Sequence, residues 1–296
     1  MRIGIDVGGT KIEAVAMDDH GNIRHRRRVA TPRGDYEATL RAIANLVEAL
    51  RIEVPGPCTI GIGIPGTISP ATGVVKNSNS VWLIGKPLDR DLERLLRQPL
   101  RFNNDANCFV LSEATDGAAA NAAVVFGVIV GTGTGGGIVV HGRVLDGHHR
   151  IAGEWGHNPL PWPERDEWPG PTCYCGRTGC IETFLSGPGL VRAYHQRTAQ
   201  VVEASELVRR AQNGEWAADQ SLAKYEHRMA RALASVINVL DPDVIVLGGG
   251  LSNIHRLYAN VPRLWLPFVF SDRVTTPIVK AAHGDSSGVR GAAWLW

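Results

Sequence analysis

The chain has 296 residues, of which 44% are hydrophobic and 20% are charged, proportions typical of a globular protein with a sizeable core. Its formal net charge of +2 is too small to indicate a polyanionic partner such as nucleic acid. The N-terminal segment lacks the apolar stretch of a secretory leader, and the longest apolar run, residues 122–130, is too short to span a membrane. The sequence therefore predicts a cytoplasmic protein in which Cys58 and Cys108 stay reduced.

The first thirty residues predict three strands separated by turns, at 3–5, 12–17 and 22–30. Asp6 ends the first strand, and the turn Gly8-Gly9-Thr10-Lys11 follows it. The basic run at 24–28 fits either a nucleic-acid contact or the decoration of an exposed strand. We favour the exposed strand, because the run lies between a turn signal and an apolar residue.

The spacing of apolar residues predicts the later elements. Helices are expected at 36–50, 88–96, 107–119, 203–212, 219–240 and 289–296, and strands at 59–64, 100–102, 124–130, 138–140, 143–145 and 243–247. A glycine and threonine loop at 131–137 lies between two strands and repeats the layout of the first thirty residues. The repeat indicates two related α/β domains, one of residues 1–118 with a C-terminal helix at about 285–296, and one of residues 119–284.

The glycine loops favour phosphate binding. The spacing of Gly131, Gly133 and Gly136 matches a dinucleotide fingerprint, but a strand follows where that fingerprint opens a helix, so NAD binding is rejected. A Walker-type loop is absent from the sequence. Two Gly/Thr turns in repeated positions can instead offer backbone N–H groups to phosphate oxygens. Asp6 is placed to hold Mg²⁺ through water, and Lys11 to reach a phosphate.

Three cysteines follow a histidine in the spacing of a metal site. Cys173, Cys175 and Cys180 lie downstream of His157, and the four side chains have the composition of a closed structural zinc site. A disulfide is the alternative, but a bridge between Cys173 and Cys175 is strained, and a cytosolic chain does not keep it oxidised. The metal is expected to fold the loop so that His157 and the flanking carboxylates, Glu154 and Glu182, face one small polar ligand.

Asp105 lies among asparagines at the expected junction of the two domains. It fits two roles, the N-cap of a helix that begins near Ala106 and the carboxylate that accepts a proton during phosphoryl transfer. The sequence leaves both roles open.

Together these motifs resemble the ROK family (repressors, open reading frames and kinases) of the actin-like sugar kinase superfamily. D-x-G-G-T-K, N-D-A-N, G-T-G-T-G-G-G, E-x-G-H and C-x-C-G-x-x-G-C-x-E occur in the family's order along the chain. The segments 63–80, 152–162 and 284–296 are most similar to bacterial fructokinases with mannokinase activity.

The resemblance implies an ATP-dependent kinase that phosphorylates the 6-hydroxyl of fructose, and of mannose or glucose as further acceptors. It implies a two-domain actin-like, hexokinase-like (ribonuclease H-like) α/β fold with a structural zinc loop, and a homodimer. Asp105 is implied as the general base, and the implied sugar-binding residues are Gly66, Thr67, Asn79, Asn104, Asp105, Glu154, His157 and Glu182. ATP with Mg²⁺ is assigned to Asp6, Gly8, Gly9, Thr10, Lys11, Gly131, Thr132, Gly133, Thr134, Gly135, Gly249, Gly250 and Asn253.

Two alternatives remain. A glucose or N-acetylhexosamine kinase of the same family has the same motifs, and its fine specificity depends on contacts that a sequence does not display. A sugar-sensing transcriptional regulator without catalysis is expected to place a DNA-reading helix-turn-helix before the first strand. The first strand is expected to begin at residue 3, which leaves no room for that motif.

Overall fold

The computed structural model describes all 296 residues and divides them into two compact units. Unit 1 is made of residues 1–121, 137–152 and 282–296, and unit 2 of residues 122–136 and 153–281. The sequence-based division differs at 137–152, which it placed in the second domain. These residues lie against α3 (Asp105–Thr115), and a Cβ on Gly137 would be only 2.8 Å from the carbonyl oxygen of Ala106.

Unit 1 contains a mixed five-stranded sheet. Its strands are β1 (Arg2–Val7), β2 (Lys11–Met17), β3 (Ile23–Ala30), β4 (Thr59–Ile64) and β7 (Arg101–Asn104), in the order β3-β2-β1-β4-β7. β1, β4 and β7 are parallel, whereas β2 and β3 return antiparallel to β1. The carboxyl ends of the three parallel strands therefore meet at one edge, which carries Asp6, Gly66 and Asn104.

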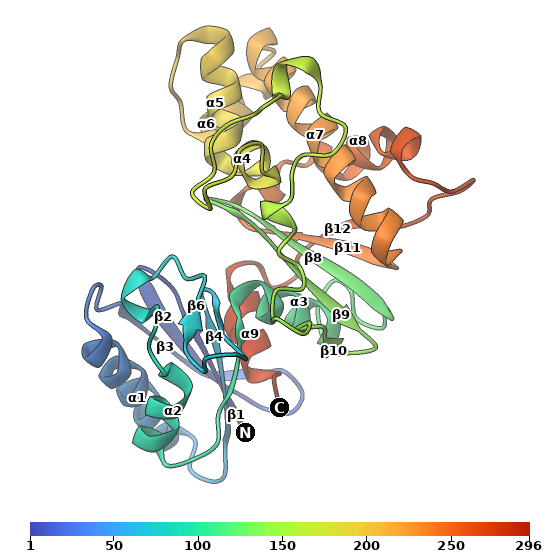
Figure 1. Cartoon of the computed structure of the whole chain (residues 1–296). Helices are drawn as coiled ribbons and strands as arrows, with labels where there is room; N and C mark the ends of the chain where they lie inside the picture. The colour runs from blue at the N-terminus through green and yellow to red at the C-terminus, as the bar shows by residue number, and fades with distance from the viewer. The chain divides into compact units, whose positions relative to one another are not determined.

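The two faces of this sheet are covered differently. Ile3, Ile5 and Val7 form one buried cluster with apolar residues of α1 (Tyr36–Glu53) and α2 (Leu88–Leu96). The other face carries glycine: a Cβ on Gly4 would lie 2.1 Å from a carbonyl oxygen of α9 (Ser287–Ala293), and a Cβ on Gly61 1.8 Å from another. The absence of side chains at these positions lets α9 pack directly on the strand backbones (Figure 1).

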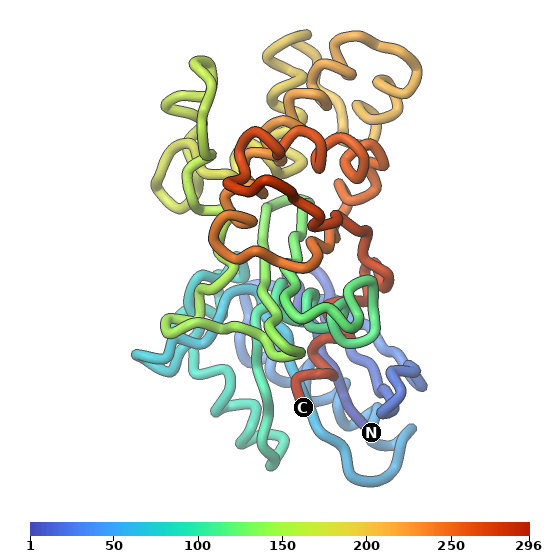
Figure 2. The backbone as a smooth tube through the Cα atoms, turned by 90° about the vertical axis from the view of Figure 1, so that its right-hand side faces the viewer, coloured from blue at the N-terminus to red at the C-terminus, as the bar shows by residue number.

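The C-terminal segment is fixed to α3 by a buried carboxylate. Glu113 accepts hydrogen bonds from the backbone N–H groups of Ala282 (2.9 Å) and His283 (3.1 Å) and from the hydroxyl of Ser287 (2.8 Å). Burial opposes ionisation of Glu113, but these hydrogen bonds outweigh it and lower its pKa. The chain ends lie close together in this unit (Figure 2), where the Trp296 indole N–H donates to the carbonyl of Ile60 at 2.7 Å.

The basic run of β3 is paired with carboxylates. Glu13, whose side chain is 3% exposed, lies 3.4 Å from Arg26 and 2.5 Å from Arg28. Arg24 lies 2.7 Å from Asp18. Because β3 is the edge strand of its sheet, these charges protect an exposed edge, and the exposed-strand interpretation is favoured.

The second sheet repeats the order of the first. Its strands are β8 (Val124–Val130), β9 (Thr134–Val140), β10 (Arg143–Val144), β11 (Val244–Gly248) and β12 (Ile278–Lys280), in the order β10-β9-β8-β11-β12, and the division between the units falls within β9. β8, β11 and β12 are parallel, as are β1, β4 and β7. The repeat inferred from the two Gly/Thr turns is thus present in the strand order.

The helices of unit 2 surround α7 (Trp216–Leu240), which contacts α4 (Ile181–Leu185), α5 (Gly187–Thr198), α6 (Ala204–Gln212) and α8 (Arg256–Leu264). A short antiparallel pair of strands in unit 1, β5 (Thr67–Ile68) and β6 (Val75–Lys76), follows β4. Short 3₁₀ helices lie at Val81–Leu83, Trp155–His157, Arg165–Glu167, Gly250–Asn253, Leu266–Phe268 and Gly284–Ser286.

None of the helices combines the length and apolarity that crossing a bilayer requires.

A buried ion-pair cluster anchors the long loop that precedes α4. Glu167 accepts hydrogen bonds from Arg228 (2.8 Å) and Arg231 (2.8 Å), and the three side chains are 0%, 8% and 1% exposed. Arg231 also donates to the carbonyl of Trp162 in the same loop. The loop is therefore held on α7 by charges that water does not reach.

Glu167→Gln is expected to destabilise the protein by about 3–5 kcal/mol, because it leaves two buried guanidinium groups without a counter-charge. The free energy of unfolding in urea measures this. Asp166→Asn is the matched control, since Asp166 is 66% exposed and pairs with Lys224 at the surface, where a pair contributes at most about 1 kcal/mol. Equal effects of the two substitutions would contradict the anchoring role of Glu167.

Candidate active site and metal centre

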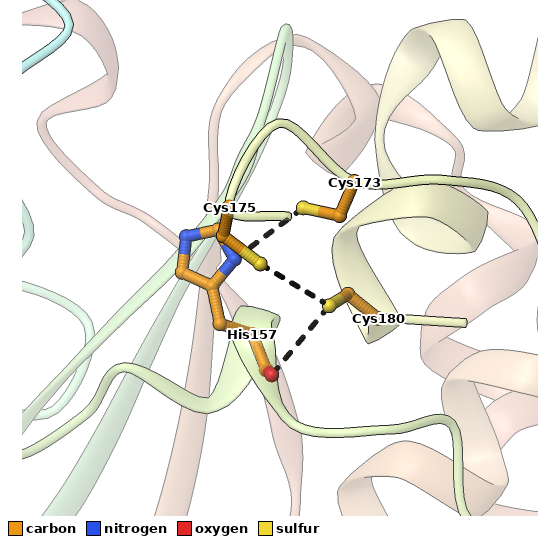
Figure 3. A group of neighbouring side chains, drawn as sticks. All are labelled: His157, Cys173, Cys175 and Cys180. Carbon is orange, nitrogen blue, oxygen red and sulfur yellow. Dashed lines mark hydrogen bonds between the residues drawn. The ribbon is translucent and has the colours of Figure 1, made fainter. Parts of the chain in front are cut away.

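Four side chains of unit 2 converge on one point (Figure 3). The ligand atoms of His157, Cys173, Cys175 and Cys180 all lie within 4.8 Å of one another. Cys173 Sγ is 3.6 Å from His157 Nδ1, and Cys175 Sγ is 3.7 Å from Cys180 Sγ. A tetrahedral zinc ion with bonds of about 2.0–2.3 Å needs ligand atoms roughly 3.5–3.8 Å apart. The cysteines are free thiols, so the set fits zinc and not a disulfide.

Tight turns bring these ligands together. The backbone N–H of Cys173 donates to the carbonyl of Arg177 (2.7 Å), and Gly176 and Gly179 have φ of +88° and +71°, a region that favours glycine. Hydrogen bonding by Arg177 lowers the pKa of Cys175 to about 6, whereas burial raises that of Cys180 to about 12. Zinc binding must therefore displace a proton from at least one buried thiol.

Tyr174, which lies between two of the metal ligands, is a contact that sequence reasoning missed. Its hydroxyl is 3.0 Å from His157 Nε2, and the two rings meet edge to face. A hydrogen bond at the second ring nitrogen fixes the orientation of a metal-bound imidazole. The resemblance implies that His157 also contacts the sugar. The only signal in the sequence is a tyrosine inside the C-x-C motif.

Glu182 connects the metal loop to the second glycine turn. It lies two residues after Cys180, in the first turn of α4, and its Oε2 accepts a hydrogen bond from the backbone N–H of Thr134 at 2.9 Å. The turn itself is shorter than the predicted loop at 131–137. Gly131 N–H bonds to the carbonyl of Gly133 (2.9 Å), and β9 begins at Thr134.

Two predicted residues, Thr134 and Gly135, change context with this correction. Thr134 and Gly135 are strand residues of β9. The Thr134 hydroxyl oxygen is buried without a hydrogen-bond partner in the protein, which fits a site for a polar ligand. Glu154 is exposed just before the 3₁₀ helix that carries His157.

The carboxyl ends of β8 and β11 meet beside a cavity of about 810 Å³. Gly249 has φ of +80°, and a Cβ there would lie 2.4 Å from the carbonyl oxygen of Val130, so this strand end requires glycine. The cavity is lined by Gly131, Thr132, Gly250 and Asn253, with an apolar wall that includes Val191 and Val208. Its volume is that of a typical small-molecule site, and the glycine turns supply N–H groups beside an apolar surface. This combination fits a nucleotide.

In unit 1 the predicted base lies at the start of α3. The N-cap is Asn104, whose side chain accepts a hydrogen bond from Asn107 N–H (2.9 Å). Asp105 is the first helical residue, and its exposed carboxylate accepts from the N–H of Ala106 (2.8 Å) and from the Asn104 amide (3.1 Å). The N-cap alternative for Asp105 is therefore wrong, because its neighbour fills that position.

Asp6 is in an environment that suits a cation. Burial, followed by repulsion from Asp105 and Glu13, raises its pKa to about 7, and Lys11 opposes this. A divalent cation nearby favours the ionised carboxylate, so Asp6 fits the predicted Mg²⁺ site. Lys11 is not a free loop cation but the first residue of β2, with its ammonium 4.0 Å from Glu13.

The other predicted residues are divided between the units. The turn Gly8-Gly9-Thr10 closes through Gly8 N–H and the carbonyl of Lys11 (2.9 Å), and Gly66 has φ of +82° at the end of β4. Asn79 is exposed after β6. Unit 1 thus carries Gly66, Thr67, Asn79, Asn104 and Asp105, and unit 2 carries Glu154, His157 and Glu182. Their roles toward a sugar stay predictions.

Known proteins resemble this chain over its whole length. N-acetyl-D-glucosamine kinases of Pectobacterium carotovorum subsp. carotovorum and Vibrio cholerae are 39% and 40% identical to it, covering 100% of this chain and 98% and 99% of those proteins. A ROK hexokinase from Thermus thermophilus superposes with a TM-score of 0.87 at 32% identity, covering 99% of this chain and 96% of that one. A ROK family glucokinase from Streptomyces griseus, in complex with glucose and AMPPNP, has a TM-score of 0.80 at 27% identity, covering 99% and 98%.

These comparisons confirm the hexokinase-like α/β fold. They do not support the closer likeness to fructokinases, because these curated relatives are named for N-acetyl-D-glucosamine. The model of the ROK family matches residues 2–296. The chain therefore belongs to the ROK family.

Proposed function

We propose that the protein is an ATP-dependent sugar kinase whose acceptor is N-acetyl-D-glucosamine. The observation that carries the proposal is the 39–40% identity, along the whole chain, to proteins named for that activity. The cavity of unit 2, with its glycine turns and apolar wall, supports ATP as the donor. The solved ROK glucokinase, which contains an ATP analogue, supports the same donor.

The residues of unit 1 suit the proton transfer. Phosphoryl transfer needs a positioned hydroxyl, a cation and a carboxylate that accepts the proton. Asp105 is exposed and fixed by two hydrogen bonds to one oxygen. In the proposed reaction the sugar hydroxyl oxygen bonds to the γ-phosphorus, the bond from that phosphorus to ADP breaks, and the proton passes to Asp105. Asp6 would hold Mg²⁺ through water, and a bound Mg²⁺ would neutralise charge on the phosphates.

The zinc has a structural role in this proposal. His157, Cys173, Cys175 and Cys180 together supply four protein ligands, so the shell is closed and leaves no position for a reactive water. The ion instead orders the loop that carries Glu154 and Glu182. It also fixes His157, whose other ring nitrogen meets Tyr174.

Initial rates of ADP formation with N-acetyl-D-glucosamine, glucose, mannose and fructose test the acceptor. We expect the highest kcat/KM with N-acetyl-D-glucosamine, by at least about tenfold, because a pocket that pairs with an acetamido group leaves polar atoms unpaired with other sugars. A preference for fructose or mannose would reject this acceptor and leave the kinase class in place. ADP formation with none of the four sugars would reject the class as well.

A further inference from the structure

We infer that Glu182 holds the Gly131–Thr134 turn in the form that binds nucleotide phosphates, and that the metal loop thereby sets nucleotide affinity. The inference rests on the proposed function, because it takes this turn as a phosphate site. Glu182 is then a positioning residue for the nucleotide, in addition to any contact it makes with the sugar.

Two hydrogen bonds hold the two ends of the turn. Glu182 Oε2 accepts from Thr134 N–H at 2.9 Å, and Gly187 N–H donates to the carbonyl of Gly131 at 2.7 Å. Both groups come from the seven residues that directly follow Cys180. The segment that follows Cys180 is therefore hydrogen-bonded to both ends of the turn, Gly131 and Thr134.

The carboxylate has little freedom to move. A Cβ on Gly133 would lie 2.7 Å from Glu182 Oε2, so the side chain packs against the turn itself. The N–H and hydroxyl of Thr183 both bond to the carbonyl of Cys180, at 2.9 and 2.7 Å. Ile181 N–H bonds to the carbonyl of Asn158, the residue after His157. One residue of the metal set, Cys180, and the residue after another, Asn158, thus fix the start of α4, and with it Glu182.

The negative charge of Glu182 distinguishes a residue that positions the turn from one that attracts the phosphates directly. A carboxylate beside a phosphate repels it, so the negative charge of Glu182 does not itself attract the phosphates. In this inference it raises affinity by ordering the turn, of which Gly131 and Thr132 line the cavity. A neutral side chain that still accepts the Thr134 hydrogen bond should serve as well.

Calorimetric titration of the zinc-loaded protein with AMPPNP and Mg²⁺ tests this. Glu182→Ala should raise the Kd by about tenfold or more, the usual consequence of losing a hydrogen bond to a charged group. Glu182→Gln should bind within about threefold of the unsubstituted protein, and zinc content should stay at one per chain in both. Glu37→Ala, an exposed glutamate of unit 1, is the control.

The role of the metal is tested by removing it. Zinc-stripped protein that still melts cooperatively should bind AMPPNP about tenfold more weakly, and stripping should add little to Glu182→Ala, because both changes release the same contact. The comparison of zinc-loaded with zinc-stripped protein also tests the inference if Glu182→Ala does not fold. Equal AMPPNP affinity before and after stripping would overturn the inference.

The outcomes separate this inference from the proposed function. If the unsubstituted protein does not bind AMPPNP, the nucleotide site itself is wrong. If it binds, and Glu182→Ala binds equally well while only the sugar KM rises, Glu182 acts on the sugar alone and the inference is overturned.

Discussion

Asp105→Asn is expected to lower kcat by roughly two to four orders of magnitude while the affinity for the sugar stays nearly unchanged. The substitution keeps the geometry, because the asparagine oxygen can accept the same hydrogen bonds from Ala106 and Asn104. It removes only the ability to take a proton. Steady-state kinetics measure the first effect, and calorimetric titration with the sugar measures the second.

Asp19→Asn is the matched control for this experiment. Asp19 is a carboxylate of the same unit that is 73% exposed and pairs with Arg2, so its loss should leave kcat within about twofold, as surface substitutions usually have small effects. If Asp105→Asn turned over as fast as this control, Asp105 would not be the base. A loss confined to sugar affinity would instead make it a binding residue.

Cys175→Ser is expected to abolish zinc binding and to lower the melting temperature of the protein markedly. A metal that forms its site only on folding contributes about 10 kcal/mol or more to that folding, and the four ligands here converge without another covalent link between them. Metal analysis should find one zinc per chain before the substitution and almost none after it. Kinase activity should fall with the metal.

Cys58→Ser controls for the loss of a thiol as such, since Cys58 is a free cysteine of unit 1 and is not one of the four residues of the metal set. It should keep its zinc and its activity. A fully active, metal-free Cys175→Ser protein would refute the structural role of zinc. Loss of activity with zinc retained would mean that Cys175 supports activity in another way than by binding zinc.

The features that sequence predicted well are those coded locally. Cys173, Cys175 and Cys180 are joined by tight turns, so their convergence with His157 could be predicted from residue identity and spacing. Strands such as β4 and β8 were predicted at their observed bounds, because continuous apolar runs end at glycine or proline. In each sheet the first two strands, β1 and β2 or β8 and β9, are neighbours joined by a Gly/Thr turn. The similarity of these two turns made the repeat visible in the sequence.

Several of the features that sequence missed depend on contacts between distant residues or on short elements, whereas the helices α5 and α8 were missed although they are 12 and 9 residues long. Glu182 and Thr134 are 48 positions apart, and no local sequence pattern near either residue indicates their hydrogen bond. Thr134 and Gly135 were predicted as loop because glycine dominates the segment, whereas pairing within the sheet extends β9 through them. The five-residue helix α4 is too short for a periodic pattern, and the acceptor sugar depends on contacts that no single motif encodes.

The same limit applies to Asn104 and Asp105, which are both good helix caps. Only the backbone shows that the asparagine takes that position and leaves the aspartate in the first turn. The cytoplasmic location and the homodimer stay predictions.

The position of α9 against Gly4 and Gly61 has a consequence for biosynthesis. The face of the first sheet that carries Gly4 and Gly61 is covered at these two positions by residues 287–293. During translation, all of unit 2 is made before this face can be covered. Unit 2 is therefore synthesised as an insertion within unit 1, and the part of the sheet that packs on α9 is completed only when the last residues of the chain are made.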